Sequence, residues 1–299
     1  METLISKAIK NPKAAASVLL SKMSFLPDKT YLKIKYRLEM GKKLNLENPQ
    51  TFNEKLQWLK VYNRKPEYTM MVDKYSVREY IKGKIGEDYL IPLLGAWEKW
   101  EDIDFGSLPN EFVLKCSHDS GSVVICRDKK IFDFMAAKKK ITRKLKMNLY
   151  SWGREWVYKD VKPRIIAEKY MVDKTGQFID YKFMCFGGYV SCVMVCIDRN
   201  IGDTKFYFFD KDWNLLRLNK RGKEAPKDFT LPKPKGMDKM FEIAETLSAG
   251  LPFSRIDLYE CDGKIYFGEI TFFPQSGFDA NLLKDTDKYF GDLIDLKGV

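Results

Sequence analysis

The stretch FSRIDLYECDGKIYFGEIT, residues 253–271, is the most informative part of the sequence. Two runs rich in apolar and aromatic residues flank Cys261-Asp262-Gly263, which is typical of two strands joined by a tight turn. Each run contains an acid within core-type sequence, Asp257 in RIDLY and Glu269 in YFGEIT. A carboxylate in such a setting needs a charged partner or a bound cation. We therefore expect a hairpin that carries a functional site.

The connection between the two strands decides whether these acids meet. A four-residue turn at 261–264 would place Asp257 opposite Gly268, with the acids on opposite faces. A three-residue connection at 262–264, or one bulge, places Asp257 opposite Glu269. Carboxylates on opposed residues would lie about 4.5–5.5 Å apart at Cβ and would repel without a divalent cation. We predict the odd connection; a surface hairpin whose polar residues face water is the alternative.

The rest of the chain predicts helices first and then mixed strands and helices. Thr51 and Glu54 have the spacing of a helix cap, and Asp73 could start a second helix. Helical stretches are expected at 1–45, 51–82, 133–160 and 237–249. Strands are expected at 112–116, 122–126, 164–171, 178–186, 189–197 and 205–210. This order indicates an α+β protein with antiparallel sheet.

Further candidate residues lie at strand ends. Lys115 ends FVLKC and precedes the Ser/Gly-containing loop SHDSG, so it could hold phosphate; a solvated strand-end lysine is the alternative. Glu168 in IIAEKYM could accept from an adenine amino group or be an exposed residue on an alternating strand. Asp180 and Lys182 are two apart and share one face. By the same period of two, Arg255 and Thr271 would join the face of the hairpin acids.

Several mechanisms are excluded by composition and motif. His118 is the only histidine, so catalysis by a histidine-activated serine or cysteine has little support. The sequence contains neither a G-x-x-x-x-G-K-[ST] phosphate loop nor a G-x-G-x-x-G dinucleotide motif. The six cysteines form no C-x-x-C pair and mostly lie in apolar runs, so we expect reduced core thiols and no zinc site.

The charge is concentrated near the start of the chain. The net charge is +11, and residues 1–43 hold ten Lys/Arg and three Asp/Glu, which makes +7. This segment could attract a nucleotide, an acidic saccharide or an anionic membrane surface, or it could be a solvated helical face. A nucleic-acid partner is not expected, because the aromatics follow core periodicity. We expect no signal peptide and no spanning helix, and hence a cytoplasmic protein with possible peripheral contact at the inner membrane.

Seven motifs in order resemble the ATP-grasp superfamily, and more closely its TupA-like group, which is linked to bacterial surface polysaccharides and teichuronopeptide. They are TFNEKLQWLK, DKYSVREYI, FVLKCSHDSGSV, EWVYKDVKPRIIAEKY, DYKFMCFGG, FSRIDLYE and YFGEITFFPQSG. The resemblance implies an ATP-grasp fold, in which two α+β subdomains with antiparallel sheets clasp ATP. It implies a basic helical extension at 1–50, a mixed region at 51–110, a small subdomain at 111–165 and a large subdomain at 166–299.

The resemblance also implies roles for individual residues. Phosphate binding falls on Lys115 and on a flexible loop at Ser120, Gly121 and Ser122. Adenine contacts fall on Glu168, Lys169, Tyr170 and Met171, and a ribose contact falls on Asp180. The metal-binding acids fall on Asp257 and Glu269. Thr271 stands where the superfamily usually has asparagine, which puts the second metal position in doubt.

The implied reaction is an ATP- and Mg²⁺-dependent ligation of a carboxylate to an amine through an acylphosphate. Lys182 and Arg199 would neutralise phosphate charge, Arg255 would hold the oxyanion, and Ser276 and Gly277 would line the acceptor pocket. Family context suggests an acidic sugar or polysaccharide precursor and an amino acid as substrates. A nucleotide-sugar glycosyltransferase is one alternative, although a D-x-D motif is absent. A basic scaffold that docks at the inner membrane through residues 1–43 is the other.

Overall fold

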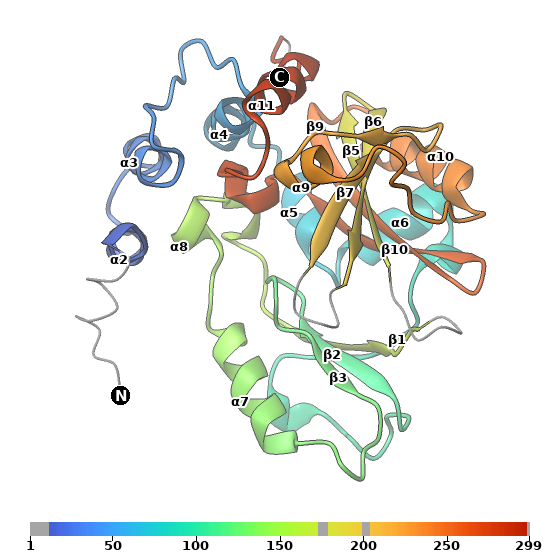
Figure 1. Cartoon of the computed structure of the whole chain (residues 1–299). Helices are drawn as coiled ribbons and strands as arrows, with labels where there is room; N and C mark the ends of the chain where they lie inside the picture. The colour runs from blue at the N-terminus through green and yellow to red at the C-terminus, as the bar shows by residue number, and fades with distance from the viewer. Residues whose placement is uncertain (1–11, 173–178, 199–203, 298–299) are drawn as a thin grey trace.

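The computed structural model of the chain describes residues 12–172, 179–198 and 204–297. Its strands form two antiparallel sheets, one above the other in Figure 1, with helices around them. The larger sheet has the order β10-β9-β5-β6-β7-β8, and the smaller has the order β1-β4-β2-β3. The α+β fold class predicted from the sequence is confirmed.

The elements have the following bounds. The α-helices are α2 (Pro12–Ser21), α3 (Asp28–Met40), α4 (Phe52–Tyr62), α5 (Glu67–Val72), α6 (Val77–Ile85), α7 (Phe134–Leu145), α8 (Tyr150–Gly153), α9 (Lys220–Glu224), α10 (Met237–Ser248) and α11 (Lys284–Leu293). The strands are β1 (Leu93–Trp97), β2 (Phe112–Cys116), β3 (Val124–Cys126), β4 (Ile165–Lys169), β5 (Asp180–Phe186), β6 (Tyr189–Ile197), β7 (Lys205–Phe209), β8 (Leu215–Leu216), β9 (Phe253–Cys261) and β10 (Lys264–Thr271). Short 3₁₀ helices include η3 (Trp156–Tyr158) and η5 (Pro274–Gly277).

The hairpin of β9 and β10 has the predicted pairing and reaches it through a bulge. Cys261 pairs with Lys264 around a two-residue turn, in which Asp262 and Gly263 have φ of 51° and 79°. Two residues with positive φ are the signature of a type I′ hairpin turn. The register then shifts between Phe267 and Glu269, so that Glu269 lies opposite Asp257.

Glycine at position 268 makes this bulge sterically possible. A Cβ there would lie 2.7 Å from the Tyr259 ring and 3.0 Å from the carbonyl oxygen of Asp257. Bulges re-aim side chains by adding one unpaired residue, and a close backbone approach requires glycine. The odd residue that brings the two acids together is therefore Gly268, and not a longer turn.

The main core is formed by the larger sheet and the helices that pack on it. The helices α6 and α10 pack against each other, and α10 also packs on β5, β6 and β9. At the end near α4 and α11 the core is aromatic, and the Phe52 ring lies 4.9 Å from Phe253 and 5.6 Å from Phe290 between centroids. Edge-to-face contacts of this kind add about 0.5–1.5 kcal/mol beyond area burial. These contacts fasten the first and last described helices of the main core to the sheet that carries the two acids.

The smaller sheet takes its strands from a wider part of the chain than expected. Its outer strand β1 lies within the predicted 51–110 region, and its inner strand β4 crosses the predicted boundary at 165. Both belong with β2 because β4 pairs with β1 on one side and with β2 on the other. The predicted boundaries at 110 and 165 therefore divide one sheet, which is built from residues between 93 and 169.

The helix α4 begins with the predicted cap and holds the turn η5. The Thr51 side chain accepts from the Glu54 backbone N–H, and the Glu54 carboxylate accepts from the Thr51 N–H, so that a capping box is complete. Further along α4, Lys60 Nζ donates to the Ser276 carbonyl at 2.7 Å, and Gln57 Nε2 donates to the Gly277 carbonyl at 2.6 Å. These buried side chains fix the backbone of η5.

The turn η5 has a backbone that costs free energy. Gln275, Ser276 and Gly277 have φ of 49°, 54° and 64°, so that two side-chain-bearing residues are left-handed. Each such residue costs about 1–3 kcal/mol and persists only where its surroundings hold it. The bonds from Lys60 and Gln57 supply that constraint.

Two expectations from composition can be compared with the structure. All six cysteines are buried thiols outside any disulfide, as expected for a reduced core. Within the described ranges, no helix combines the length and apolar character needed to cross a membrane.

We predict that Gly277→Ala lowers the free energy of unfolding by about 2–4 kcal/mol, more than left-handed strain alone would cost. The added Cβ would lie 2.4 Å from Gln57 Nε2 and 3.0 Å from Leu56 Cβ. Gly263→Ala is the matched control, because Gly263 also has positive φ but a Cβ added there would have no atom within 4 Å. Urea denaturation of both variants measures the difference; equal costs would show that α4 does not constrain η5.

We predict a pH dependence of stability from His118. Burial lowers the pKa of this imidazole, with Asp119 opposing, and the ring Nε2 lies 3.1 Å from the carbonyl oxygen of Met147. The pKa of His118 in the unfolded chain is about 6.5, so below that pH the unfolded chain binds a proton more readily than the folded chain does. The contribution of His118 is then complete above about pH 6.5 and is lost as the pH falls below that value. Urea denaturation between neutral and mildly acidic pH should show a steeper loss for the wild type than for His118→Gln; parallel curves would contradict this assignment.

Candidate functional site

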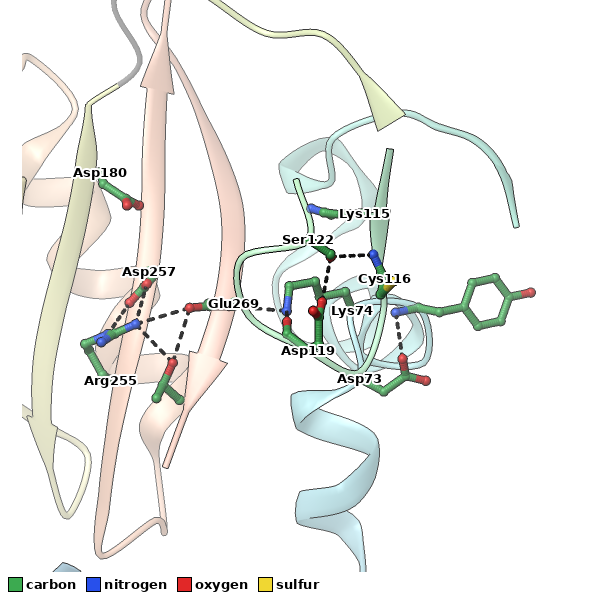
Figure 2. Close-up of polar contacts among 12 residues, drawn as sticks. Asp73, Lys74, Lys115, Cys116, Asp119, Ser122, Asp180, Arg255, Asp257 and Glu269 are labelled. Carbon is green, nitrogen blue, oxygen red and sulfur yellow. Dashed lines mark hydrogen bonds and ion pairs between the residues drawn. The ribbon is translucent and has the colours of Figure 1, made fainter. Parts of the chain in front are cut away.

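Three neighbouring strands place a lysine and two acids in one row across the larger sheet. Lys182 on β5 pairs with Asp257 on β9, and Asp257 pairs with Glu269 on β10. The Lys182 ammonium contacts Asp257 Oδ2 and lies 3.1 Å from Asp180 Oδ2. The predicted positions Asp180, Lys182, Asp257 and Glu269 therefore form one cluster, with Asp180, Asp257 and Glu269 drawn in Figure 2.

Arg255 links the two hairpin acids. Its Nε donates to Asp257 Oδ1 at 2.7 Å, and its Nη2 donates to Asp257 Oδ2 at 2.8 Å. The same Nη2 donates to Glu269 Oε1 at 3.1 Å and to Thr271 Oγ1 at 3.1 Å. One guanidinium thus lies between carboxylates that would otherwise repel each other, as Figure 2 shows. The face shared by Arg255 and Thr271 is the one predicted from the period of two.

Burial and charge act against each other on these acids. Burial raises the pKa of Asp257, and Arg255 and Lys182 oppose that rise. Burial would also raise the pKa of Glu269, but Lys74 and Arg255 outweigh it and hold this pKa well below the usual range. The Glu269 side chain is one-third exposed, whereas Asp257 is almost fully buried. Glu269 is therefore an ionised oxygen donor that a ligand from solvent can reach.

A loop of the smaller sheet faces Glu269. Lys74 Nζ lies 3.5 Å from Glu269 Oε2 and donates to the carbonyl of Asp119 at 2.7 Å, so it connects the two parts of the site (Figure 2). Ser122 Oγ donates to Asp119 Oδ1 at 2.6 Å and accepts from the Cys116 N–H at 2.7 Å. These bonds close the loop at residues 117–122, which we name the 117–122 loop.

The two exposed residues of this loop, Ser120 and Gly121, lie beside another lysine. Lys144 Nζ donates to the Ser120 carbonyl at 3.1 Å, and Gly121 has φ of 83°. A Cβ on Gly121 would lie 3.9 Å from that ammonium. Lys74 and Lys144 thus flank the 117–122 loop. This arrangement can hold an anion through ammonium groups and backbone N–H donors.

Lys115 and Glu168 are paired at the neighbouring strand ends. Lys115 Nζ lies 2.6 Å from Glu168 Oε2, and the guanidinium of Arg78 lies 3.8 Å from Glu168 Oε1. Glu168 is buried, so it is not the exposed strand residue considered as an alternative. The remaining positions predicted to contact adenine follow directly: Lys169 is exposed, and Tyr170 and Met171 are half-buried. The predicted phosphate lysine and adenine acid thus lie in direct contact.

A cavity of about 450 Å³ opens next to Arg255 on the larger sheet. It is lined by β5–β7, by α9 and by the segment from Pro274 to Leu282. From η5 the lining residues are Pro274 and Gln275, whereas Ser276 and Gly277 are held by α4. The acceptor role of Ser276 and Gly277 stays a prediction. Arg199 lies outside the described residues.

The site contains basic residues to which sequence reasoning gave no role. Lys74, Arg78 and Lys144 contact Glu269, Glu168 and the 117–122 loop, respectively. The first two lie four residues apart in DKYSVREYI, and that spacing was the available signal. Lys144 lies in a lysine-rich helix, where its neighbours in sequence give no reason to single it out.

The acidic pair fits a magnesium ion that arrives with phosphate ligands. No group of three or more His, Cys, Asp or Glu residues suited to a metal occurs in the part of the chain that the structure describes. Mg²⁺ is usually bound by one or two carboxylates together with waters and substrate phosphates, and not by an all-protein cage. Asp257, Glu269 and the Thr271 hydroxyl are hard oxygen donors around one cation, the Arg255 guanidinium. The donor set therefore suits this ion.

The solved structures to which the chain is similar are distant in sequence. The chain is 17% identical to the D-alanine–D-alanine ligase of Bacillus anthracis complexed with ATP, with a TM-score of 0.42. The match covers 75% of this chain and 65% of that protein. For the Helicobacter pylori D-alanine–D-alanine ligase the identity is 14% and the TM-score 0.43, and the match covers 83% of this chain and 70% of that protein. For a RimK domain ATP-grasp protein of Sphaerobacter thermophilus the identity is 14% and the TM-score 0.41, and the match covers 78% of this chain and 70% of that protein. No curated protein matches the chain.

A family model gives the assignment. The model described as TupA-like ATPgrasp matches residues 54–295, which include both sheets, the acidic pair and the 117–122 loop. The match confirms the predicted fold and enzyme class, an ATP-dependent ligase of ATP-grasp type. The chain belongs to the TupA-like ATP-grasp family.

Proposed function

We propose that this enzyme joins a carboxylate to an amine after ATP has converted the carboxylate to an acylphosphate. The observation that carries the proposal is the position of Asp257 and Glu269 opposite Lys74 and the 117–122 loop. A nucleoside triphosphate bound with a metal ion needs cations near its phosphate oxygens and carboxylates near its metal. The lysines beside the 117–122 loop and the acids Asp257 and Glu269 offer both, and Lys74 contacts the two groups.

The nucleotide would lie along residues of the smaller sheet. Lys115, Lys74 and Lys144 offer ammonium groups to phosphate oxygens, and the 117–122 loop adds N–H donors. Glu168 is held by Lys115 and Arg78 at the start of the segment that we propose contacts adenine. Asp180, at the start of β5, is our candidate for the ribose contact.

Asp257 and Glu269, with Thr271 beside them, would hold magnesium. When bound, this ion would neutralise charge on the phosphate oxygens. Lys182 is held against Asp257 and Asp180, which orients its ammonium on the same sheet face. The protein thus places fixed charges before the reaction begins, so little reorganisation is needed when phosphoryl charge develops.

Arg255 connects this cluster to the cavity of about 450 Å³. In the proposed reaction, a carboxylate oxygen attacks the γ-phosphorus and ADP leaves. The amine then attacks the acyl carbon, phosphate leaves and the nitrogen loses a proton. Arg255 is positioned to bind the oxyanion of that second step, because it lines the cavity and remains protonated: burial would lower its pKa, but Asp257 more than offsets this and raises it.

We propose an acidic sugar or polysaccharide precursor and an amino acid as the substrates. The cavity volume is within the range of about 300–1,000 Å³ typical of small-molecule sites. Its lining includes Lys205, Lys220 and Arg221 in addition to Arg255, and two acids, Glu224 and Asp279. The excess of basic residues supports an anionic substrate, and the acids supply a place for an ammonium group.

Mass spectrometry of reaction mixtures tests this function. ATP, uronic acids and a panel of amino acids should yield an amide together with ADP and phosphate in equal amounts, and no product should form without ATP. Turnover of a nucleotide sugar with release of nucleoside diphosphate, in the absence of ATP, would instead support a glycosyltransferase.

We predict that Asp257→Asn lowers kcat by at least about 10²-fold, the scale of losing one preorganised electrostatic group. The substitution keeps the shape of the side chain but removes the charge that balances Arg255 and Lys182. Asp212→Asn, at an exposed carboxylate, is the matched control and should keep full activity. Steady-state ATP turnover measures both; an active Asp257→Asn enzyme would contradict the metal assignment.

We predict that Lys74→Met lowers kcat/KM for ATP by about tenfold or more, the equivalent of one hydrogen bond to a charged group. Lys74 contacts both Glu269 and the 117–122 loop, so its loss should raise KM for ATP while KM for the acceptor changes little. Lys65→Met, at an exposed lysine, serves as the control. Unchanged kinetics in Lys74→Met would show that this lysine has only a structural role.

A further inference from the structure

The helices α2 and α3 expose apolar side chains that a folded protein usually buries. Phe25, between the two helices, is 80% exposed, and Leu19 and Val18 on α2 are 60% and 46% exposed. The opposite side of α2 is occupied, because Ser17 and Leu20 are buried. The exposed side of α2 is thus apolar without a partner within the described chain. We name Val18, Leu19 and Phe25 the N-terminal apolar patch.

The same segment carries an uncompensated positive charge. Residues 12–43 contain eight Lys/Arg and two Asp/Glu, a difference of +6. Both acids are already paired, Asp28 with Arg64 at 2.5 Å and Glu39 with Lys35 at 3.0 Å. Exposed cations remain around the patch, with Lys13 and Lys22 before and after the exposed turn of α2 and Lys33 on α3.

Side-chain contacts attach this segment to the rest of the enzyme, at a place remote from both sheets. The hydroxyl of Tyr31 on α3 donates to the carbonyl of Trp152 in α8 at 2.7 Å, and the guanidinium of Arg154 lies 4.2 Å from the centre of the Tyr31 ring. Figure 1 shows α2 and α3 at the outer edge of the molecule, remote from both sheets. A partner bound to α2 and α3 would therefore not cover the proposed nucleotide site.

We propose that α2 and α3 dock on an anionic lipid bilayer, with the N-terminal apolar patch in the interfacial region. Aromatic and aliphatic side chains beside lysines are the composition of segments that lie in a membrane surface, and anionic lipid attracts each nearby lysine. A second copy of the chain fits less well, because three apolar side chains fall far short of the roughly 20 residues a side found in stable dimers. This inference does not depend on the ligase reaction.

Co-sedimentation of the full chain with lipid vesicles tests the proposal. Vesicles of phosphatidylglycerol and phosphatidylcholine in equal amounts should bind the protein about tenfold or more tightly than vesicles of phosphatidylcholine alone, and added salt should weaken the binding. Equal binding to both vesicle types, or none to either, would overturn it.

Matched variants separate the patch from the overall charge of the protein. Leu19→Glu with Phe25→Glu should lower binding to the anionic vesicles by about tenfold or more. The control is Ile131→Glu with Met135→Glu, which adds the same charge at side chains that are 84% and 77% exposed in another part of the molecule. Equal loss in both double variants would refute the role of the patch, as would retained binding in the first. Self-association that Leu19→Glu and Phe25→Glu abolish, without vesicle binding, would assign the surface to a second copy instead.

Discussion

The contact on which the site depends is the bridge from Arg255 to Asp257 and Glu269. Two carboxylates on opposed strand positions are unstable without a cation between them. Here the Arg255 guanidinium contacts both, and Lys182 adds a second cation on Asp257. The bridge neutralises the pair before any ligand arrives, while the Glu269 side chain stays one-third exposed. A ligand-borne cation would thus meet a site that is already shaped.

The remaining architecture serves to place that bridge. The bulge at Gly268 brings Glu269 opposite Asp257, and Lys74 ties Glu269 to the loop of the smaller sheet. On the other side, Lys60 and Gln57 hold η5 in a strained conformation beside the cavity that Arg255 lines. Two segments that precede the smaller sheet in sequence, the turn between α5 and α6 and the helix α4, therefore hold the 117–122 loop and η5, respectively, next to the bridge.

The hairpin and its acidic pair could be predicted because local patterns determine them. Apolar runs on both sides of Asp262-Gly263 specify a tight hairpin, and parity then leaves few registers. The choice between a longer turn and a bulge at Gly268 depends on how the Tyr259 ring lies against that backbone, which is a tertiary contact. Lys74 reaches Glu269 across 195 positions in sequence, and no local pattern reports such a distance. The elements β8 and α9 were not predicted, because two and five residues are too few to show a period. The helix α11 was not predicted either, because its charged residues outnumber its apolar ones.

A crystal structure with a non-hydrolysable ATP analogue and Mn²⁺, in which anomalous scattering locates the metal, would show whether Asp257 and Glu269 hold it. We expect a manganese peak in contact with both acids, with the phosphates between these acids and the 117–122 loop. A nucleotide bound elsewhere, or a metal that contacts neither acid, would contradict this expectation.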